Sequence, residues 1–441
     1  MDGTTAESAL KCRCVVRWPL NAAEMIEFVV GIFIVVYLGM ILGGLPLVQL
    51  DRTGIALLGA IALIGFDAVS LEEAARSIHL PTLILLFAFM VVSAQMRLGG
   101  FYDGVTRWLT RLPLAPPLLI GALIFMVAAL SAVFSNDIVC LAVAPVLIDA
   151  CRGRGMDPRP FLLALACGAN IGSAATLIGN PQNMLIGETL HLSFAGYLLE
   201  AALPVGLGLV ATWALMLALT HGQLVNVADI ASHDDTRDGT TPEEGIPLDL
   251  WQTIKGLTVA LAIVACFLFT PWPREVVALT GAGVLLTSRR LHSRQMLGLV
   301  DWELLVLFMG LFVVNHALQK TGLPARLVAD LAAVGVPLQQ LGPLFATTFV
   351  LSNIVSNVPA VMLLLPSVAH TLAGPTLALV STLAGNLFIV GSVANIIVVD
   401  AAARRGIAIS WRQHARIGIP VTFVTLAIVA DYLVLRWPGA S

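Results

Sequence analysis

Long apolar stretches, separated by short polar connections, cover most of the chain from about residue 26 to residue 435. Most of these stretches approach the roughly 20 residues that a helix needs to cross a bilayer, allowing for tilt. The pattern therefore predicts an all-α polytopic membrane protein. Continuous transmembrane helices are expected at residues 26–48, 53–69, 81–96, 200–220, 251–269, 275–287, 302–319 and 416–435.

Four segments depart from this pattern of continuous crossing helices. Residues 101–112 carry apolar and basic residues at helical spacing, and residues 323–334 occupy the corresponding place later in the chain, so both are expected to lie in the interface plane. Residues 1–24 form a polar tail without the apolar region of a signal peptide. Residues 221–250 are acidic and rich in turn formers, and we interpret them as a mobile linker.

One polar stretch, ANIGSAATLIGNPQNMLIG at residues 169–187, has apolar sequence on both sides and therefore lies at membrane depth. Gly and Pro are the weakest helix formers, and each unpaired amide in lipid is costly, so a continuous helix is not expected here. We interpret residues 160–187 as a broken helix whose second half starts at Pro181, with Asn180 as its cap. Such backbone is tolerated only where protein buries it or water lines it. The alternative is a Gly/Pro kink that serves packing alone.

Three further apolar segments carry a similar interruption. Residues 116–151 and 341–371 are each apolar apart from one short polar group, and we expect each to form a re-entrant hairpin of two half-length helices. Residues 375–400 are expected to form a second broken helix. The hairpin tips are Ser135-Asn136-Asp137 and Ser356-Asn357.

The interrupted elements recur in the same order in both halves of the chain. Residues 25–220 form a first repeat and residues 251–441 a second, each with five crossings, one of them broken, plus a hairpin that does not cross. Because five is odd, the second half must start from the opposite side of the membrane, which makes the repeat inverted and points to a binding site at the broken helices. The matched residues are Asn136 with Asn357, Pro145 with Pro366, Asn170 with Asn386, Asn183 with Asn395 and Pro204 with Pro420.

Composition supports the prediction of a membrane protein, and the lack of known motifs argues against several other functions. The chain is 58% hydrophobic and 12% charged, whereas soluble domains are about 25% charged. The six cysteines show no disulfide framework, and Cys12-x-Cys14 is interpreted as incidental. Glu188-x-x-His191 has a ligand-like spacing but no completing residues, so a pair at the membrane interface is expected. No hydrolase, metalloprotease or nucleotide-binding motif is present, and we expect neither an enzyme, a cofactor nor a nucleic-acid partner.

Basic residues indicate an orientation in a cell (inner) membrane. Sixteen of the 24 Lys and Arg residues fall on the side opposite the N-terminus, and cytoplasmic loops carry the excess of Lys and Arg. The linker at residues 221–250 is therefore expected in the cytoplasm and the C-terminus outside. The first hairpin would enter from the cytoplasm and the second from outside.

Each hairpin tip and each break places the end of one half-helix beside the start of another. The unpaired carbonyls of an ending helix suit a cation, and the unpaired amides of a starting helix suit an anion, whereas a single Ser-Asn pair is more often an ordinary cap. The candidate substrate- and ion-binding residues are Ser135, Asn136, Asp137, Asn170, Thr176, Asn180, Asn183, Ser356, Asn357, Asn386, Ser392 and Asn395. Sodium, as one candidate coupling ion, is expected near Ser135, Asn136, Asp137 and Asn183 and near Ser356, Asn357 and Asn395.

Asp137 is the one carboxylate placed in a membrane-depth interruption, and its partner by repeat is Val358. An ionisable group at this depth is expensive and is a functional candidate. It could bind Na⁺ as a carboxylate or carry a proton as a neutral acid. The alternative is a helix N-cap, a position that Asp favours.

At these residues the sequence resembles the ion-transporter superfamily, which includes divalent-anion/sodium symporters, arsenite permeases and a class of sodium/proton antiporters. It is most similar to bacterial permeases described as anion or arsenite transporters. The motifs are IGNPQN at residues 178–183, SNIVSNVPAVMLLLP at 352–366 and GSVANIIVV at 391–399. The resemblance implies a homodimer and elevator-type motion of a transport domain, residues 113–220 and 341–436, against a scaffold, residues 26–96 and 251–319.

The third tip position departs from the family pattern, because the dicarboxylate symporters carry Ser-Asn-Thr at both tips. Here these positions are Asp137 and Val358, and an acidic tip would repel a dianion unless it were protonated or neutralised. The sequence therefore favours a secondary active transporter that moves a small anion or arsenite-like substrate through the bilayer by alternating access, coupled to H⁺ or Na⁺. The alternatives are arsenite or antimonite efflux driven by the proton gradient, a sodium/proton antiporter, and a receptor or channel.

Overall fold

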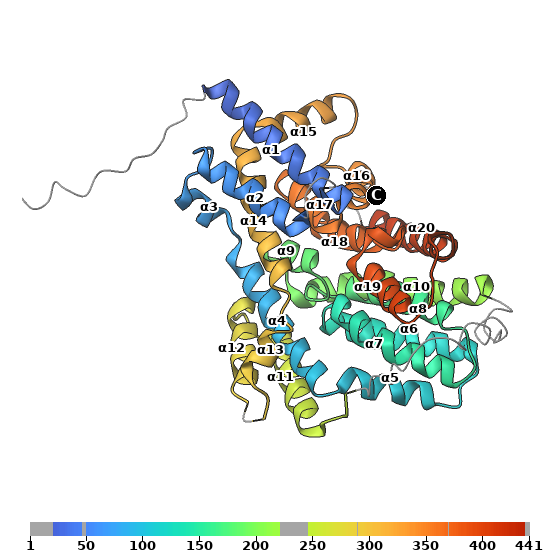
Figure 1. The fold of residues 1–441 in the computed structure, drawn as a ribbon. Coiled ribbons are helices and arrows are strands. Elements are labelled where there is room, and N and C mark those ends of the chain that lie inside the picture. Colours follow the sequence, from blue (N-terminus) through green and yellow to red (C-terminus); the bar gives the residue numbers. More distant parts are fainter. Residues whose placement is uncertain (1–20, 46–49, 221–245, 289, 369, 437–441) are drawn as a thin grey trace, which may run out of the picture. The chain divides into compact units, whose positions relative to one another are not determined.

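The structure is a computed structural model that describes residues 21–45, 50–220, 246–288, 290–368 and 370–436. Within these residues the chain forms twenty α-helices, two short 3₁₀ helices and one two-stranded antiparallel sheet (Figure 1). Most of the predicted tail and linker, together with Cys12 and Cys14, lies outside the described residues. The interpretations of those segments stay predictions.

The all-α polytopic membrane fold is confirmed. Among the described helices, seven are long and apolar enough to cross a membrane. They are α1 (Ala22–Leu42), α4 (Leu80–Leu98), α6 (Pro116–Val133), α10 (Phe194–Leu219), α11 (Leu250–Phe269), α14 (Trp302–Lys320) and α20 (Trp411–Arg436). Two expected spans are present as the shorter helices α2 (Arg52–Gly65) and α12 (Arg274–Leu286). The 13 residues of α12 give about 20 Å of helix, less than the roughly 30 Å of hydrocarbon core.

The chain divides into two compact units, Met1–Ile78 with Met309–Pro324, and His79–Phe308 with Ala325–Ser441. Helix α14 contributes residues to both. The predicted scaffold and transport domains follow other boundaries, because α4, α11 and α12 fall in the second unit together with the hairpins. The division into scaffold and transport domains therefore stays a prediction.

The first unit is built on α1 and α2. Helix α1 begins with a capping box, in which Asn21 Oδ1 accepts from the Glu24 backbone N–H at 2.9 Å and Glu24 Oε2 accepts from the Asn21 N–H at 2.8 Å. Buried Tyr37 donates to Oδ1 of Asn315 at 2.9 Å, which joins α1 to the end of α14 within this unit. Its other elements are β1 (Gly44–Leu45), β2 (Leu50–Asp51) and α3 (Leu71–Ser77).

The second unit holds all four interrupted elements. Helix α6 packs along α8, α7 packs against α8 and α19, and α16 packs against α18, so segments from both halves of the chain lie side by side (Figure 1). The remaining helices of the chain are α5 (Phe101–Arg111), α7 (Asn136–Gly153), α8 (Pro158–Ser173), α9 (Pro181–Thr189), α13 (Ser293–Leu297), α15 (Leu323–Ala333), α16 (Leu341–Val355), α17 (Asn357–Leu364), η1 (Leu365–Ser367), α18 (Ala373–Ala384), η2 (Ile389–Gly391) and α19 (Val393–Arg404).

The first break lies where the glycines and asparagines predict it. Helix α8 ends at Ser173 and α9 begins at Pro181, whose ring fits the first turn because no intrahelical amide bond is needed there. Asn180 caps α9, since its Oδ1 accepts from the Asn183 backbone N–H at 2.9 Å. A Cβ at Gly179 would overlap the backbone of Ser173, so only glycine permits this close return of the chain. The segment is therefore a gap between two helices, as interpreted, and not the alternative of a kink within one helix.

The other three interruptions are also present. The first hairpin turns at Ser135, between α6 and α7, and the second at Ser356, between α16 and α17. The expected half-length helices are wrong for the first hairpin, because α6 and α7 have 18 residues each and α6 is long and apolar enough to cross a membrane. Helix α18 ends at Ala384, and α19 starts at Val393 after the short turn η2. At each interruption, the end of one helix lies close to the start of the next within the second unit. The candidate site is therefore sought at these helix ends.

Candidate functional site

Asn183 holds the first break together. Its Nδ2 donates to the carbonyl of Thr176 in the open segment at 2.9 Å and to that of Ser173, the last residue of α8, at 3.5 Å. The side chain of Asn180 also reaches back, with Nδ2 donating to Oγ of Ser173 at 3.1 Å. Thr176 Oγ1 donates to the Ala132 carbonyl at the end of α6, so the break is tied to the first hairpin. These buried amides replace the backbone bonds that the interrupted helix cannot make.

Asn395 holds the second break in the same way. Its Nδ2 donates to the carbonyls of Gly385 at 2.8 Å and Phe388 at 3.1 Å. Gly385 and Phe388 lie ten and seven residues before Asn395, as Ser173 and Thr176 do before Asn183. The two breaks, which lie in different halves of the chain, are therefore each held by one asparagine side chain with the same spacing to its carbonyl partners.

Asn170 joins the two breaks. Its Nδ2 donates to Oδ1 of Asn386 at 2.9 Å and to Oδ1 of Asn395 at 3.0 Å. Its Oδ1 accepts from Nδ2 of Asn136 at 3.0 Å and from Oγ of Ser392 at 2.9 Å. All four bonds of this buried amide thus connect α8 to the first hairpin tip and to the second broken helix. We call this group, with Asn180, Asn183 and Thr176, the asparagine network.

The two hairpin tips differ in backbone conformation. Ser135 has φ −55° and ψ 130°, which is favourable for any residue, whereas Ser356 has φ 77° and ψ 161°, a region populated almost only by glycine. Neither serine makes a side-chain cap bond to its helix. Asn357 lies beside Gly385, next to the second break. The structure therefore brings both tips to the broken helices but gives the serines no capping role.

Three buried polar atoms at these helix ends have no hydrogen-bond partner among the described residues. They are Oδ1 of Asn136, Oδ1 of Asn357 and Nδ2 of Asn386. Asn136 and Asn357 occupy matched positions in the first turns of α7 and α17. Buried polar atoms are nearly always paired, so two orphaned carbonyl oxygens at equivalent tips are consistent with ligands that the chain itself does not supply.

Asp137 lies in the first turn of α7, one residue after Asn136. The N-cap of this helix is Ser135, so Asp137 does not occupy the cap position that the alternative reading gives it. No hydrogen bond or ion pair links its carboxylate to another described residue. The helix dipole stabilises a carboxylate near a helix N-terminus. Without a partner among the described residues, the group is available to a cation or a proton.

Several residues of the network escape sequence reasoning. Thr382 on α18 accepts at Oγ1 from Nδ2 of Asn180 and from Nε2 of Gln182, both at 3.2 Å. Its place as a polar residue near the end of an apolar helix, four residues before Asn386, was the available signal. His414 on α20 donates from Nε2 to the Asn386 carbonyl at 3.1 Å, and its sequence context carries no comparable sign.

Glu188 has a ligand-like spacing to His191 in the sequence, and the structure gives it a different partner. Glu188 forms an ion pair with Arg274 at 2.9 Å, and Arg274 also donates to the Gly187 carbonyl at 2.9 Å, so Glu188 ties α9 to α12. Across the described part of the chain, no group of three or more His, Cys, Asp or Glu side chains is arranged to hold a metal ion. The oxygens available to a cation at the breaks are amide, hydroxyl and backbone oxygens.

Comparisons with known proteins agree with this architecture. The family described as Citrate transporter matches residues 32–384. An uncharacterized transporter of Mycobacterium tuberculosis is 31% identical over 431 residues, covering 91% of this chain and 99% of the relative. The silicon efflux transporter LSI3 of Oryza sativa subsp. japonica is 30% identical, covering 87% of this chain and 92% of its own. The solved YdaH transporter of Alcanivorax borkumensis shares the fold with a TM-score of 0.53 and 14% identity, covering 94% of this chain and 98% of that one.

Proposed function

The chain belongs to the citrate transporter family, and on that premise we propose that it is a secondary active transporter that moves a small anion coupled to H⁺ or Na⁺. The asparagine network is the proposed binding site. Transporters place substrate and ion sites at discontinuous helices, where the protein can expose the site to one side of the membrane at a time.

The observation that carries this proposal is the pair of orphaned oxygens, Oδ1 of Asn136 and Oδ1 of Asn357. A buried amide oxygen without a partner costs about 1–3 kcal/mol, a cost that a bound cation or a hydroxyl of the substrate removes. Asn136 lies in the first turn of α7 and Asn357 in the first turn of α17. Each residue lies next to a broken helix that has backbone carbonyls in its open segment. Oxygen ligands of this kind suit Na⁺.

Helix starts supply the anion-binding half of the proposed site. Helices α7, α9, α17 and α19 begin at the interruptions, and the positive end of each helix dipole favours negative charge. The network itself consists of amides and hydroxyls, which can donate to oxyanion oxygens without a full positive charge. Asp137 then provides the negative charge that a coupling cation or proton would neutralise while the anion is bound.

A second candidate function is the efflux of a small neutral oxyacid. It is favoured by the relationship to the rice silicon efflux transporter, which is 30% identical and aligned over 87% of this chain. Amide and hydroxyl groups bind neutral hydroxyls as well as anions, so the network is compatible with both substrates. Arsenite, also a small oxyacid, belongs with this candidate.

The mechanism proposed for either substrate is alternating access. The predicted scaffold and transport domains would move relative to one another within a homodimer, with the predicted orientation placing the linker at residues 221–250 in the cytoplasm. These features rest on the resemblance to the ion-transporter superfamily and on the recurrence of the interrupted elements.

Uptake by proteoliposomes tests the proposed function. Purified protein is reconstituted with a pH-sensitive dye inside, and radiolabelled citrate, phosphate, arsenite and silicic acid are offered with a Na⁺ gradient, a proton gradient or neither. The account predicts gradient-driven accumulation of at least one anion, abolished by Asn170→Ala. Movement of silicic acid or arsenite alone would favour the second candidate. Proton movement driven by a Na⁺ gradient, with no transport of any of the four solutes, would contradict both candidate functions and indicate a sodium/proton antiporter.

A further inference from the structure

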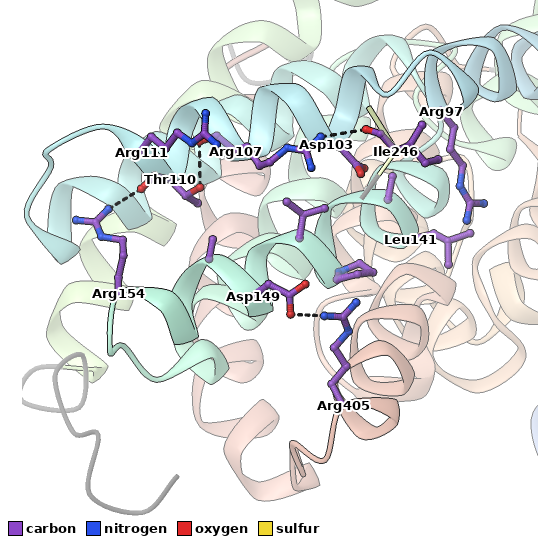
Figure 2. A pocket seen from close by; sticks show the side chains of 14 residues that line it. Arg97, Asp103, Arg107, Thr110, Arg111, Leu141, Asp149, Arg154, Ile246 and Arg405 are labelled. Carbon is purple, nitrogen blue, oxygen red and sulfur yellow. Dashed lines mark hydrogen bonds and ion pairs between the residues drawn. The ribbon is translucent and has the colours of Figure 1, made fainter. Parts of the chain in front are cut away.

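A cavity with several charged side chains in its lining lies between α5 and α7, with Arg405 at the end of α19 completing its wall (Figure 2). Its volume is about 620 Å³, within the range of small-molecule sites. None of the residues that line it belongs to the asparagine network. The charged residues of its lining are Arg97, Arg107, Arg111, Arg154 and Arg405, against Asp103 and Asp149. We call it the arginine pocket.

Two of the five arginines have an acidic partner within the pocket. Arg405 forms an ion pair with Asp149 on α7, as Figure 2 shows. Arg107 interacts electrostatically with Asp103, one turn earlier on α5, and also donates to the Ile246 carbonyl at 3.0 Å. Asp103 also interacts electrostatically with Arg97. Five arginines against two aspartates leave an excess of three positive charges in the lining.

Arg154 is held in place without being neutralised. Its guanidinium donates to the carbonyls of Thr110 at 3.0 Å, Leu112 at 3.4 Å and Leu114 at 2.9 Å, in the last turn of α5 and the connection that follows it. Carbonyls carry no net charge, so the guanidinium stays fully positive at this end of the pocket. It also fixes the connection after α7 to α5, so the pocket has a defined wall.

Arg97 and Arg111 have no hydrogen bond or ion pair within the described part of the chain. Arg97 lies in the last turn of α4 and Arg111 in the last turn of α5. Positive charge near a helix C-terminus is favourable, which offsets part of the cost of gathering three such side chains in one cavity. Their forked donors are therefore available to a ligand.

The chemistry of such a ligand follows from the guanidinium group. Arginine forks bind phosphate and carboxylate oxygens in a bidentate fashion, and a cleft with a positive excess concentrates multivalent anions. Leu141, Pro145 and Val146 on α7 form an apolar part of the wall, so the cavity combines charged and apolar surfaces. Trp108 on α5 is 61% exposed, as expected for a residue at lipid headgroup level.

We propose that the arginine pocket binds a phosphate-bearing anion that links α5 to α7. Two sources share this chemistry, namely the headgroup of an anionic phospholipid and free phosphate or pyrophosphate. A ligand held by Arg111 from α5 and by Arg154 after α7 restrains the hairpin against the interfacial helix. Binding to the folded state alone stabilises the protein in proportion to ligand concentration.

Ligand binding by the purified full-length protein tests this inference. Phosphatidylglycerol retained in neutral detergent is measured by native mass spectrometry, and inorganic pyrophosphate is titrated by thermal shift. The test variant is Arg97→Gln/Arg111→Gln, which leaves Arg154 and its bonds to α5 unchanged. The matched control is Arg404→Gln/Arg412→Gln, which removes the same charge from residues outside the pocket lining. Arg111→Gln alone, a change at an exposed side chain, serves if the double variant does not fold.

The expected result is a loss of roughly tenfold or more in affinity for one of the two probes in the pocket variant, with little change in the control. A loss confined to phosphatidylglycerol identifies the lipid headgroup, and a loss for pyrophosphate identifies the free anion. Equal losses in both double variants would show general surface attraction and overturn the proposal. Absence of specific binding of either probe to the unaltered protein would overturn it as well.

Discussion

Replacing Asn170 by alanine is expected to uncouple the two broken helices. The amide of Asn170 makes four side-chain bonds, to Asn136, Asn386, Ser392 and Asn395, with donor–acceptor distances of 2.9–3.0 Å. Alanine removes all four bonds and leaves a cavity among buried polar groups. The adjacent residues Ala169 and Ile171 have no polar side chain, and Oγ of Ser173 already donates to the Asn170 carbonyl.

The loss of stability follows from those four bonds. Side-chain hydrogen bonds inside membrane proteins contribute about 0.6 kcal/mol each on average, which sets a lower estimate of about 2 kcal/mol. Four partners left unpaired in a buried site raise the cost, since each unpaired group can forfeit about 1 kcal/mol or more. We therefore expect Asn170→Ala to lower the free energy of unfolding by about 2–4 kcal/mol.

Unfolding in mixed micelles, followed by circular dichroism as the SDS fraction rises, measures this loss. Asn353→Ala is the matched control, because Asn353 on α16 makes a single bond, from Nδ2 to the Phe349 carbonyl at 2.9 Å, and its Oδ1 has no partner among the described residues. The control should lose about 1 kcal/mol or less. If Asn170→Ala is no less stable than Asn353→Ala, the bonds of Asn170 do not organise the site.

Two further predictions concern the second hairpin tip and the first unit. Ser356→Gly should raise thermal stability, because it relieves a backbone conformation that costs about 1–3 kcal/mol. Ser135→Gly should lower stability by about 0.5–1 kcal/mol, because Ser135 has an ordinary conformation and glycine adds only backbone freedom. Calorimetry measures both variants, and shifts of the same sign would contradict the difference in backbone strain. Hydrogen bonds from Lys320 lower the pKa of Glu73 from 4.5 to about 2, so the stability that Glu73 adds is present above pH 4.5 and is lost as the pH falls toward 2. The melting temperature of Glu73→Gln should therefore lie below that of the unaltered protein above pH 4.5, and the difference should shrink as the pH falls toward 2. A difference that stays constant with pH would show that the ion pair with Lys320 does not cause it.

The interruptions were predictable because their causes are local. Gly179, Asn180 and Pro181 each favour the end or start of a helix by conformation or capping, so a short stretch of sequence is enough to predict the break. The apolar lengths likewise predict crossing helices without knowledge of their neighbours. The same local reasoning explains why the Asn180 cap is present as expected.

The partners of each side chain were not predictable in this way. Asn170 and Asn386 are 216 residues apart, and their bond depends on how α8 and α18 pack. Thr382 and His414 enter the site from helices whose facing sides are set by that packing. The strained backbone of Ser356 was also inaccessible, because the tip motif is the same Ser-Asn pair that adopts an ordinary conformation at Ser135.

The arginine pocket illustrates the same limit. Its arginines come from four segments, of which the one with Arg405 is far from the others in the sequence. Counting basic residues indicates only which side of the membrane they occupy. Their convergence requires α5 to lie along α7, which amphipathic periodicity alone does not specify.

Gradient-driven transport by Asp137→Asn tests most directly whether this network is a coupled transport site. Asn keeps the size of Asp but cannot release a proton and has no full charge to hold Na⁺. In proteoliposomes, the variant should retain its fold and exchange activity while losing accumulation against a gradient, and Val358→Asp in the same background should not restore it. Undiminished gradient-driven accumulation by a well-folded Asp137→Asn protein would contradict the coupling role of this carboxylate.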